Sequence, residues 1–215
     1  MNKKSELVRS GLSLCIVGAL SGCATNGMTR SGFLDTYDTL APTRYEHVLM
    51  FREPGFLPTR YAEVVVEHPS IKTSTGRIEG LDDAQQREVL DYVDTELHRQ
   101  ASKIPAAAGA TGRVRLRVAV TELQTPNRMV NAMTLLLVGP VTTGGASLEF
   151  EAVDDSTGRR VGAATCFDRG NVFTEFFASY TVLGHAKAAI ATCIERVDDA
   201  WRDTKSFTPI AAVPP

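Results

Sequence analysis

The side chains in this sequence that could do covalent or metal chemistry are four cysteines and four histidines. They are Cys15, Cys23, Cys166, Cys193, His47, His68, His98 and His185. Thiolates and imidazoles act as nucleophiles, bases or metal ligands only where the chain brings suitable partners to them. The sequence has no Cys-x-x-Cys, His-Glu-x-x-His or Gly-x-Ser-x-Gly motif, and no histidine lies at metal-ligand spacing from another histidine or cysteine. We therefore predict no catalytic residue, no metal ligand and no cofactor, and we expect that the protein is not an enzyme.

Cys23 stands at the end of a sequence typical of a secretory signal. A basic start is followed by an apolar run over residues 10–20, which is too short to span a bilayer. Residues 20–23 then read Leu-Ser-Gly-Cys, which resembles the lipobox of bacterial lipoproteins, where the thiol accepts a diacylglyceryl group. We predict that residues 1–22 are a lipoprotein signal peptide and that Cys23 is lipidated. The alternative is an incidental cysteine beside an ordinary signal cleavage site.

The lipobox resemblance also predicts where the protein resides. Three acyl chains of roughly a dozen methylenes, at about 0.8 kcal/mol each, would bind a membrane with about 30 kcal/mol of gross free energy. Ala24 stands where an aspartate in lipoprotein sorting signals specifies inner-membrane retention, so we predict an anchor in outer-membrane lipid with the domain facing the periplasm. Residues 23–32 are expected to be the lipidated cysteine and a flexible tether, and residues 33–207 a single periplasmic α+β domain. Residues 208–215 are expected to be a disordered tail.

The charge of the chain excludes one class of partner. The precursor has 23 basic and 25 acidic residues, and removal of residues 1–22 takes away more basic residues than acidic ones. A mildly acidic domain lacks the clustered basic excess that binds nucleic acid. We therefore expect a lipid anchor and an envelope protein as partners, and no nucleic acid.

The apolar residues follow the periods of strands and helices in a definite order. Strands are predicted at residues 60–71 and 112–123 and in a hairpin over 147–168, and helices from Asp82 to Pro105 and from Tyr180 to Thr204. The order strand, helix, strand, strand, strand, helix predicts an α+β two-layer sandwich, in which a small mixed or antiparallel sheet carries both helices on one face. The residues before the first of these strands are expected to be extended, loop-rich chain on a surface, with an edge strand near Glu46 to Phe51.

Charged residues alternate with apolar ones on two of the predicted strands. The first strand carries Arg113, Arg115 and Arg117, and the next carries Glu149 and Glu151. The arginine row could form a site for an anion or a phospholipid headgroup. We favour exposed cross-strand ion pairs, worth a few tenths of a kcal/mol each, on a solvated face of the sheet.

Cys166 and Cys193 are the two thiols that remain after processing. An oxidising periplasm favours their pairing, and Cys193 adjoins the apolar face of the last predicted helix. Cys166 faces away from the helices if its neighbours Val161, Ala163, Thr165 and Phe167 face them, unless a β-bulge reverses the alternation. A disulfide and two free thiols therefore both remain open.

Two apolar segments do not fit this plan. Residues 127–146 are too interrupted by glycine and proline for a membrane span, and they form either a crossover over the sheet or a segment that docks a partner or inserts in a membrane. The second segment is an aromatic cluster that forms either core or an exposed partner patch. It consists of Phe173, Phe176, Phe177 and Tyr180.

Several of these stretches together, in this order, resemble a known family. They are the Gly-Phe-Leu of residues 32–34 with Tyr37, the strand with Glu149 and Glu151, and the turn Asp-Ser-Thr-Gly of residues 155–158. They resemble an uncharacterised family of Gram-negative lipoproteins that share a domain of unknown function. The resemblance implies an outer-membrane lipoprotein and supplies no catalytic residue.

Two functions follow as expectations. We favour a non-enzymatic, outer-membrane-anchored lipoprotein that is an interaction or accessory component of cell-envelope maintenance or transport. The alternative is a small-ligand-binding or enzymatic periplasmic domain with a site under residues 127–146. A closed pocket with converging polar groups would favour the alternative, and a flat apolar patch near Phe176 would favour the first.

Overall fold

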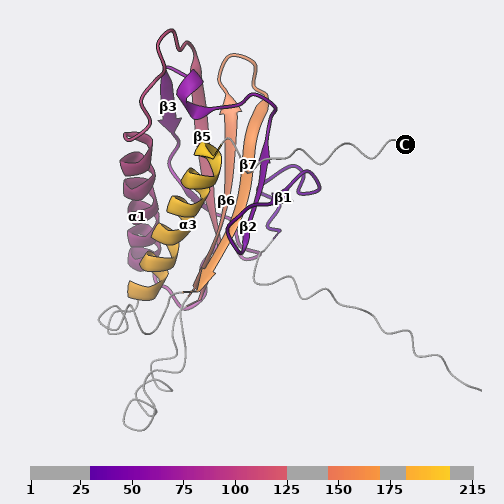
Figure 1. Cartoon of the computed structure of the whole chain (residues 1–215). Helices are drawn as coiled ribbons and strands as arrows, with labels where there is room; N and C mark the ends of the chain where they lie inside the picture. Colours follow the sequence, from indigo (N-terminus) through magenta and orange to yellow (C-terminus); the bar gives the residue numbers. More distant parts are fainter. Residues whose placement is uncertain (1–29, 125–144, 170–182, 204–215) are drawn as a thin grey trace, which may run out of the picture.

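The computed structural model describes residues 30–124, 145–169 and 183–203 of the 215-residue chain. The described residues form two α-helices and one mixed sheet of seven strands, so the predicted α+β class is confirmed (Figure 1). The elements in chain order are β1 (Ala41–Pro42), β2 (Val48–Arg52), a 3-10 turn η1 (Pro58–Arg60), β3 (Glu63–Val66), β4 (Ser70–Ile71), α1 (Asp83–Ala101), β5 (Arg113–Gln124), β6 (Gly145–Asp154), β7 (Arg160–Arg169) and α3 (Gly184–Arg202).

The sheet combines antiparallel and parallel pairing. Its strand order is β1-β2-β7-β6-β5-β3, and β4 also pairs with β5. Strands β3 and β4 run parallel to β5, because α1 crosses between them, and the other pairs are antiparallel. The two longest ladders join β5 to β6 and β6 to β7, so these three strands form the centre of the sheet.

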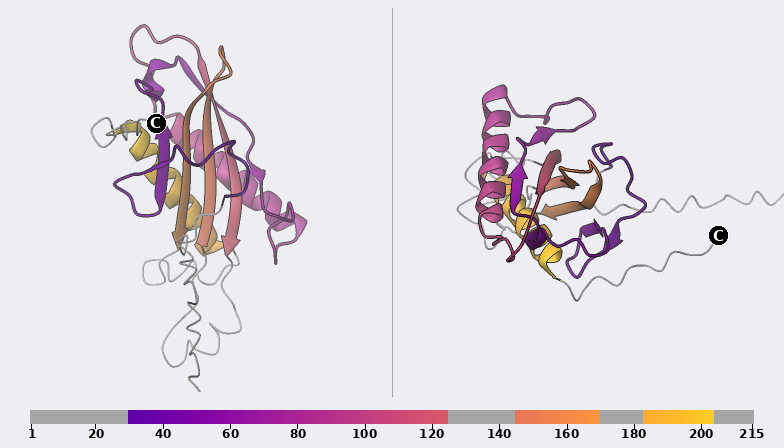
Figure 2. Two further views of the ribbon diagram at one scale, coloured as in Figure 1. Left: turned by 90° about the vertical axis from the view of Figure 1, so that its right-hand side faces the viewer. Right: turned by 90° about the horizontal axis from the view of Figure 1, so that it is seen from above.

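The two helices lie on the same side of the sheet (Figures 1 and 2). Helix α3 packs on β6 and β7, where Phe150 meets Trp201 edge to face with ring centroids 6.2 Å apart, and α1 packs on α3 and β3. The predicted apolar face of the last helix is buried throughout. It consists of Leu183, Ala186, Ile190, Ile194, Val197 and Trp201.

Local signals in the sequence predicted the main elements well. The capping box at the start of α1 is present, since the Asp82 carboxylate accepts from the Gln85 amide at 2.8 Å and the Gln85 side chain accepts from the Asp82 amide at 3.0 Å. The expected strand near residues 46–51 is β2, but it is not at the edge, because β1 pairs along its outer side. Strand β1 has only two residues and no periodic pattern that could predict it.

A disulfide joins β7 to α3. Cys166 and Cys193 are both fully buried, and their Cα atoms lie 5.7 Å apart. Cys166 faces the helices because the register of β7 against β6 shifts beside Val161, which leaves Gly162, Ala164 and Cys166 on the helix side. The bulge therefore reverses the alternation that would have turned Cys166 away from the helices.

No helix among the described residues is long and apolar enough to cross a membrane. Several predictions fall outside the described residues. They are the signal peptide at 1–22, Cys23, Ala24, the apolar segment up to residue 144, the patch of Phe173, Phe176, Phe177 and Tyr180, and the tail at 208–215.

Candidate functional site on the polar face of the sheet

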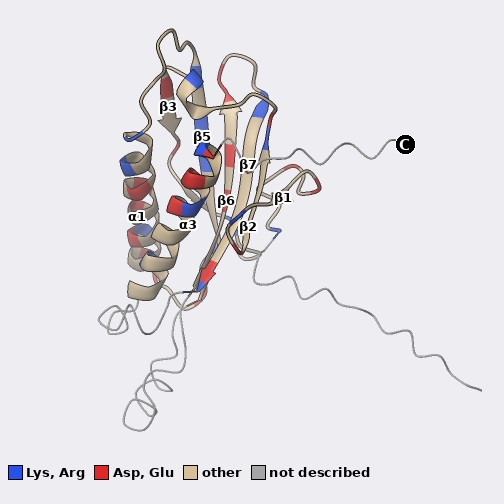
Figure 3. Cartoon of the chain, viewed as in Figure 1, with Lys and Arg blue, Asp and Glu red and all other residues tan. Residues whose placement is uncertain are grey.

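The face of the sheet that points away from the helices carries charged and small side chains, and we call it the polar face. It consists of Arg113, Arg115, Arg117 and Ala119 of β5, Ser147, Glu149, Glu151 and Val153 of β6, and Ala163 and Thr165 of β7. Basic residues follow β5 and acidic residues follow β6 (Figure 3). Residues 31–38, which we call the N-terminal strap, cross this face on the side opposite the helices (Figure 2, left).

Glu149 is the main polar attachment point of the strap. Its carboxylate is fully buried and accepts hydrogen bonds from the Ser31 amide at 2.9 Å, the Ser31 hydroxyl at 3.0 Å and the Tyr37 hydroxyl at 2.7 Å. Within the described part of the chain, all of these donors are neutral. Burial of a carboxylate is costly unless its oxygens are hydrogen-bonded, so Glu149 and the strap depend on each other.

Tyr37 closes the strap into a compact turn. Its hydroxyl oxygen accepts from the Gly32 amide at 2.8 Å while its proton goes to Glu149. Burial raises the pKa of Tyr37, and the negative charge of Glu149 raises it further. The phenol therefore stays protonated and acts as a donor. Gly32 has a positive φ of 77°, which a glycine adopts without strain.

Glu151 and Arg117 form a second attachment point beside the first. Arg117 Nη1 lies 2.7 Å from Glu151 Oε2, and the Arg117 guanidinium lies over the Phe33 ring at 5.5 Å from its centroid. Burial raises the pKa of Glu151, and the charge of Arg117 opposes that rise. One arginine thus neutralises a buried carboxylate and contacts an aromatic ring of the strap.

The far end of the strap is held by one apolar and one polar contact. Leu34 is only 2% exposed, although it does not belong to the main core, which lies on the other, helix-bearing side of the sheet. Arg160 Nη1 donates to the Thr36 carbonyl at 3.2 Å. The strap is therefore held along its length by three strands of the sheet, rather than at a single point.

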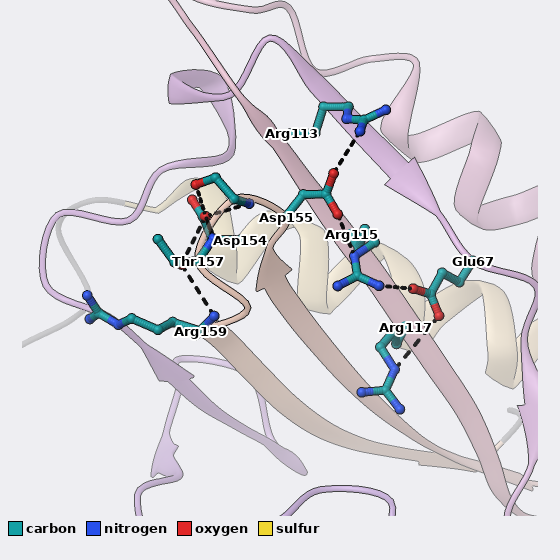
Figure 4. Close-up of polar contacts among 9 residues, drawn as sticks. Glu67, Arg113, Arg115, Arg117, Asp154, Asp155, Thr157 and Arg159 are labelled. Atoms are coloured by element: carbon teal, nitrogen blue, oxygen red, sulfur yellow. Dashed lines mark hydrogen bonds and ion pairs between the residues drawn. The ribbon is translucent and has the colours of Figure 1, made fainter.

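An alternating ladder of charges extends the site along β5 (Figure 4). Asp155 lies 2.9 Å from both Arg113 and Arg115, and Glu67 lies 3.2 Å from Arg115 and 3.8 Å from Arg117. The arginine side chains are 40–58% exposed, so each pair contributes little to stability. The ladder holds Arg117 in place over the strap.

The turn that joins β6 to β7 is fixed by Asp154. One of its oxygens, Oδ1, accepts from the amide and hydroxyl of Ser156 and from the amide and hydroxyl of Thr157, at 2.6–3.0 Å. The Ser156 hydroxyl and the turn amides lower the pKa of Asp154 to about 2. The Asp-Ser-Thr-Gly stretch of the sequence is therefore a structural turn that places Asp155 next to the arginines (Figure 4).

The prediction of exposed cross-strand ion pairs is only half right. Arg117 and Glu151 are directly opposite in the register and form the expected pair. The prediction of a solvated face is wrong for the glutamates, because Glu149 is 0% and Glu151 4% exposed. The strap covers them, and no local pattern in β5 or β6 reveals a cover supplied by residues more than 100 positions away.

The spacing of the histidines in the sequence did not predict that two of them lie beside the same carboxylate. His68 and His98 both approach Asp94, with Nδ1 to carboxylate distances of 3.7 Å and 3.4 Å. Both imidazoles are more than half exposed, which agrees with surface roles. In the described ranges, no group of three or more histidine, cysteine, aspartate or glutamate side chains could hold a metal ion.

The side chains of the polar face bind the protein's own N-terminal strap. Buried carboxylates, a guanidinium over an aromatic ring and a buried leucine are the contacts by which the sheet holds this turn of chain. The motifs that are far apart in the sequence, Gly32 to Tyr37 and Glu149 to Glu151, meet here. Fold and site together define a class of α+β domain whose sheet binds its own N-terminal segment.

Residues 29–197 match the family model DUF3313, described as a protein of unknown function, and the chain belongs to this family. The expected resemblance to a family with a domain of unknown function is thereby confirmed. No curated protein matches the chain.

Several solved structures resemble the fold at low sequence identity. A variant of the PelC dodecamer from Paraburkholderia phytofirmans is 18% identical with a TM-score of 0.43, over 74% of this chain and 98% of that chain. A DUF330 protein from Xanthomonas campestris is 14% identical with a TM-score of 0.40, over 70% and 88%. A candidate lipoprotein from Caulobacter crescentus is 9% identical with a TM-score of 0.36, over 67% and 89%.

Proposed function

We propose that the protein is a lipid-anchored component of the cell envelope that binds another envelope component and does not catalyse a reaction. The acyl chains on Cys23 would hold it to the outer membrane, with the domain in the periplasm. The main support for this proposal is the N-terminal strap. The strap begins at Ser31, eight positions after Cys23, and Ser31 and Tyr37 bind it to Glu149 of the sheet.

The length of chain between Cys23 and the strap limits how far the sheet can lie from the membrane. Ser31 follows Cys23 by eight positions, and a fully extended chain over eight positions reaches roughly 28 Å. A lipid on Cys23 would therefore keep the polar face of the sheet near the membrane. The opposite, helix-bearing side would face the periplasm, where a partner can reach it.

The anchor is tested with Cys23→Ser in the native host. We expect no incorporation of labelled palmitate and loss of the protein from the membrane fraction, because the thiol is the acylation site. The control is Cys166→Ser with Cys193→Ser, which replaces the two cysteines of the disulfide, keeps the lipobox thiol and should leave labelling intact. Normal palmitate labelling of the Cys23→Ser protein would refute the anchor, and Ala24→Asp should move the labelled protein to the inner membrane.

The partner is sought at the aromatic cluster of residues 173–180, which we propose as the docking patch. A photo-crosslinking residue at Phe176 should capture one envelope protein in living cells. The same crosslinker at Glu63, an exposed residue of β3, is the control. Equal capture from both positions would remove the support for a specific partner at this patch.

A further inference from the structure

A polar hollow of about 480 Å³ lies where the N-terminal chain enters the sheet. Three segments line it: the start of the strap, the turn that follows β4, and the end of β5. Its lining includes Arg30, Ser31, Lys72, Ser74, Arg77 and Thr121. Because Arg30 is the first residue that the structure describes, the hollow opens beside the end of the chain that leads to Cys23.

Three cationic side chains line the hollow, and they are only weakly neutralised. Lys72 is exposed and forms no ion pair within the described residues. The Arg30 guanidinium lies 3.7 Å from the Asp38 carboxylate, but these side chains are 68% and 89% exposed, so the pair is weak. Arg77 pairs with Asp83, and both side chains are again exposed. All three cations therefore remain accessible to an external anion.

Two carboxylates also line the hollow. Glu122 accepts a hydrogen bond from the Gln124 side chain at 2.7 Å, and Glu79 is exposed to solvent. Among the lining side chains, the cations therefore exceed the carboxylates by one. An excess of this size gives a site of low intrinsic affinity for an anion, so its ligand must be held near it by other means.

The turn after β4 holds two of the cations in fixed places. The hydroxyls of Thr73 and Thr75 both donate to the Arg77 carbonyl, at 2.7 Å and 3.0 Å. The Lys72 amide donates to the Val120 carbonyl of β5 at 2.9 Å. Because the backbone that carries these two cations is already ordered, less entropy is lost when they bind a ligand.

The length of chain before Arg30 puts the hollow close to a membrane if Cys23 is lipidated. Arg30 follows Cys23 by seven positions, which reach roughly 25 Å when fully extended. A ligand in the same membrane would therefore bind as an intramolecular partner, at an effective concentration on the order of millimolar. Such a concentration compensates for a low intrinsic affinity.

We propose that this hollow binds the phosphate group of an anionic phospholipid in the membrane that holds the anchor. The inference rests on the proposed function, because the lipid on Cys23 is what brings phospholipids within reach. The Arg77 guanidinium can donate two parallel N–H groups to phosphate oxygens, and Lys72 adds a second positive charge. This contact would turn the end of β5 toward the bilayer and fix the orientation of the domain.

The experiment uses the mature, acylated protein in nanodiscs of phosphatidylcholine, with or without phosphatidylglycerol. A fluorophore on Ala84→Cys, an exposed position at the start of α1, reports the distance to nitroxide-labelled headgroups. We expect phosphatidylglycerol to increase the quenching by about twofold or more, because each cation near an anionic surface favours contact. Lys72→Gln with Arg77→Gln should abolish the increase. Arg60→Gln with Lys103→Gln removes two exposed cations that do not line the hollow, and this matched control should keep the increase.

Equal quenching in the two kinds of nanodisc would overturn the inference. So would the same loss in the control variant, because net charge alone would then explain the attraction. Displacement by micromolar inorganic phosphate would also overturn it, because the hollow would then be a site for free phosphate. Protein that carries no acyl chain and does not enter the nanodiscs would instead contradict the proposed function, whereas acylated protein without the phosphatidylglycerol effect contradicts only this inference.

Discussion

Glu149 shows how one side chain fixes the path of a chain segment more than 100 residues away. Its carboxylate is fully buried, and its donors within the described chain are the backbone and hydroxyl of Ser31 and the hydroxyl of Tyr37. Hydrogen bonds to a charged acceptor are worth about 1.5–3 kcal/mol, and they offset the cost of burying the charge.

Glu149→Gln should therefore release the strap. The amide group has one acceptor oxygen fewer for the same three donors, so we expect the free energy of unfolding to fall by about 2 kcal/mol. Trypsin should also cleave faster after Arg30, because local opening of the strap becomes easier. Glu63→Gln on the exposed edge strand is the control and should change stability by less than about 0.5 kcal/mol. Unchanged unfolding and cleavage would show that the strap does not depend on Glu149.

Asp154 gives the fold a pH dependence at the acid end. Its pKa in the folded protein is about 2, below the ordinary 3.8, so its contribution is present above pH 3.8 and is lost as the pH falls through 2. The full shift would be worth about 2.5 kcal/mol, but the side chain is partly exposed and therefore screened by solvent, so we expect about 1 kcal/mol. In urea unfolding, Asp154→Ala should be less stable than the wild type at pH 7, and the two should converge near pH 2. A constant difference from pH 7 to pH 2 would contradict this origin.

At the scale of elements, α1 is the clearest case of local control. Asp82→Ala removes the side-chain acceptor for the Gln85 amide, and we expect a loss of about 1 kcal/mol in the free energy of unfolding. Asp91→Ala, an exposed position in the middle of the same helix, should change it by less than about 0.5 kcal/mol. Equal effects of the two substitutions in urea titrations would mean that the cap does not stabilise the folded protein.

The elements that the sequence predicted are those whose signals are local. Strand β5, the β6–β7 hairpin and both helices each contain a regular spacing of apolar residues and residues that mark where the element begins or ends. Strand β1 and the strap do not, because they are held by partners far along the chain, as Ser31 is by Glu149. Strand β2 was expected from the sequence, but its position inside the sheet, with Val48 opposite Cys166, was not.

At the scale of the whole molecule, the disulfide ties the sheet to α3. The bond between Cys166 and Cys193 spans 27 residues, and closing a loop of that length lowers the entropy of the unfolded state by an amount worth about 3.5 kcal/mol. Cys166→Ala with Cys193→Ala should lower the free energy of unfolding by 2–4 kcal/mol, and reduced wild type should behave like the variant. Thiol titration of the denatured, unreduced protein should find no free thiol at these positions. Two free thiols, or equal stability of oxidised and reduced protein, would contradict the prediction.

The sequence by itself determined the α+β class, the order of the main elements and the family to which the chain belongs, because apolar periods, caps and turns are local properties. It also supplied the lipobox prediction, which rests on a contiguous motif. Only the tertiary structure decided that Cys166 faces α3, since a bulge beside Val161 reverses the alternation. It also decided that the glutamates of β6 are buried under the N-terminal strap. Such pairings form between residues far apart in the chain, and their partners are fixed by packing and register rather than by any local pattern.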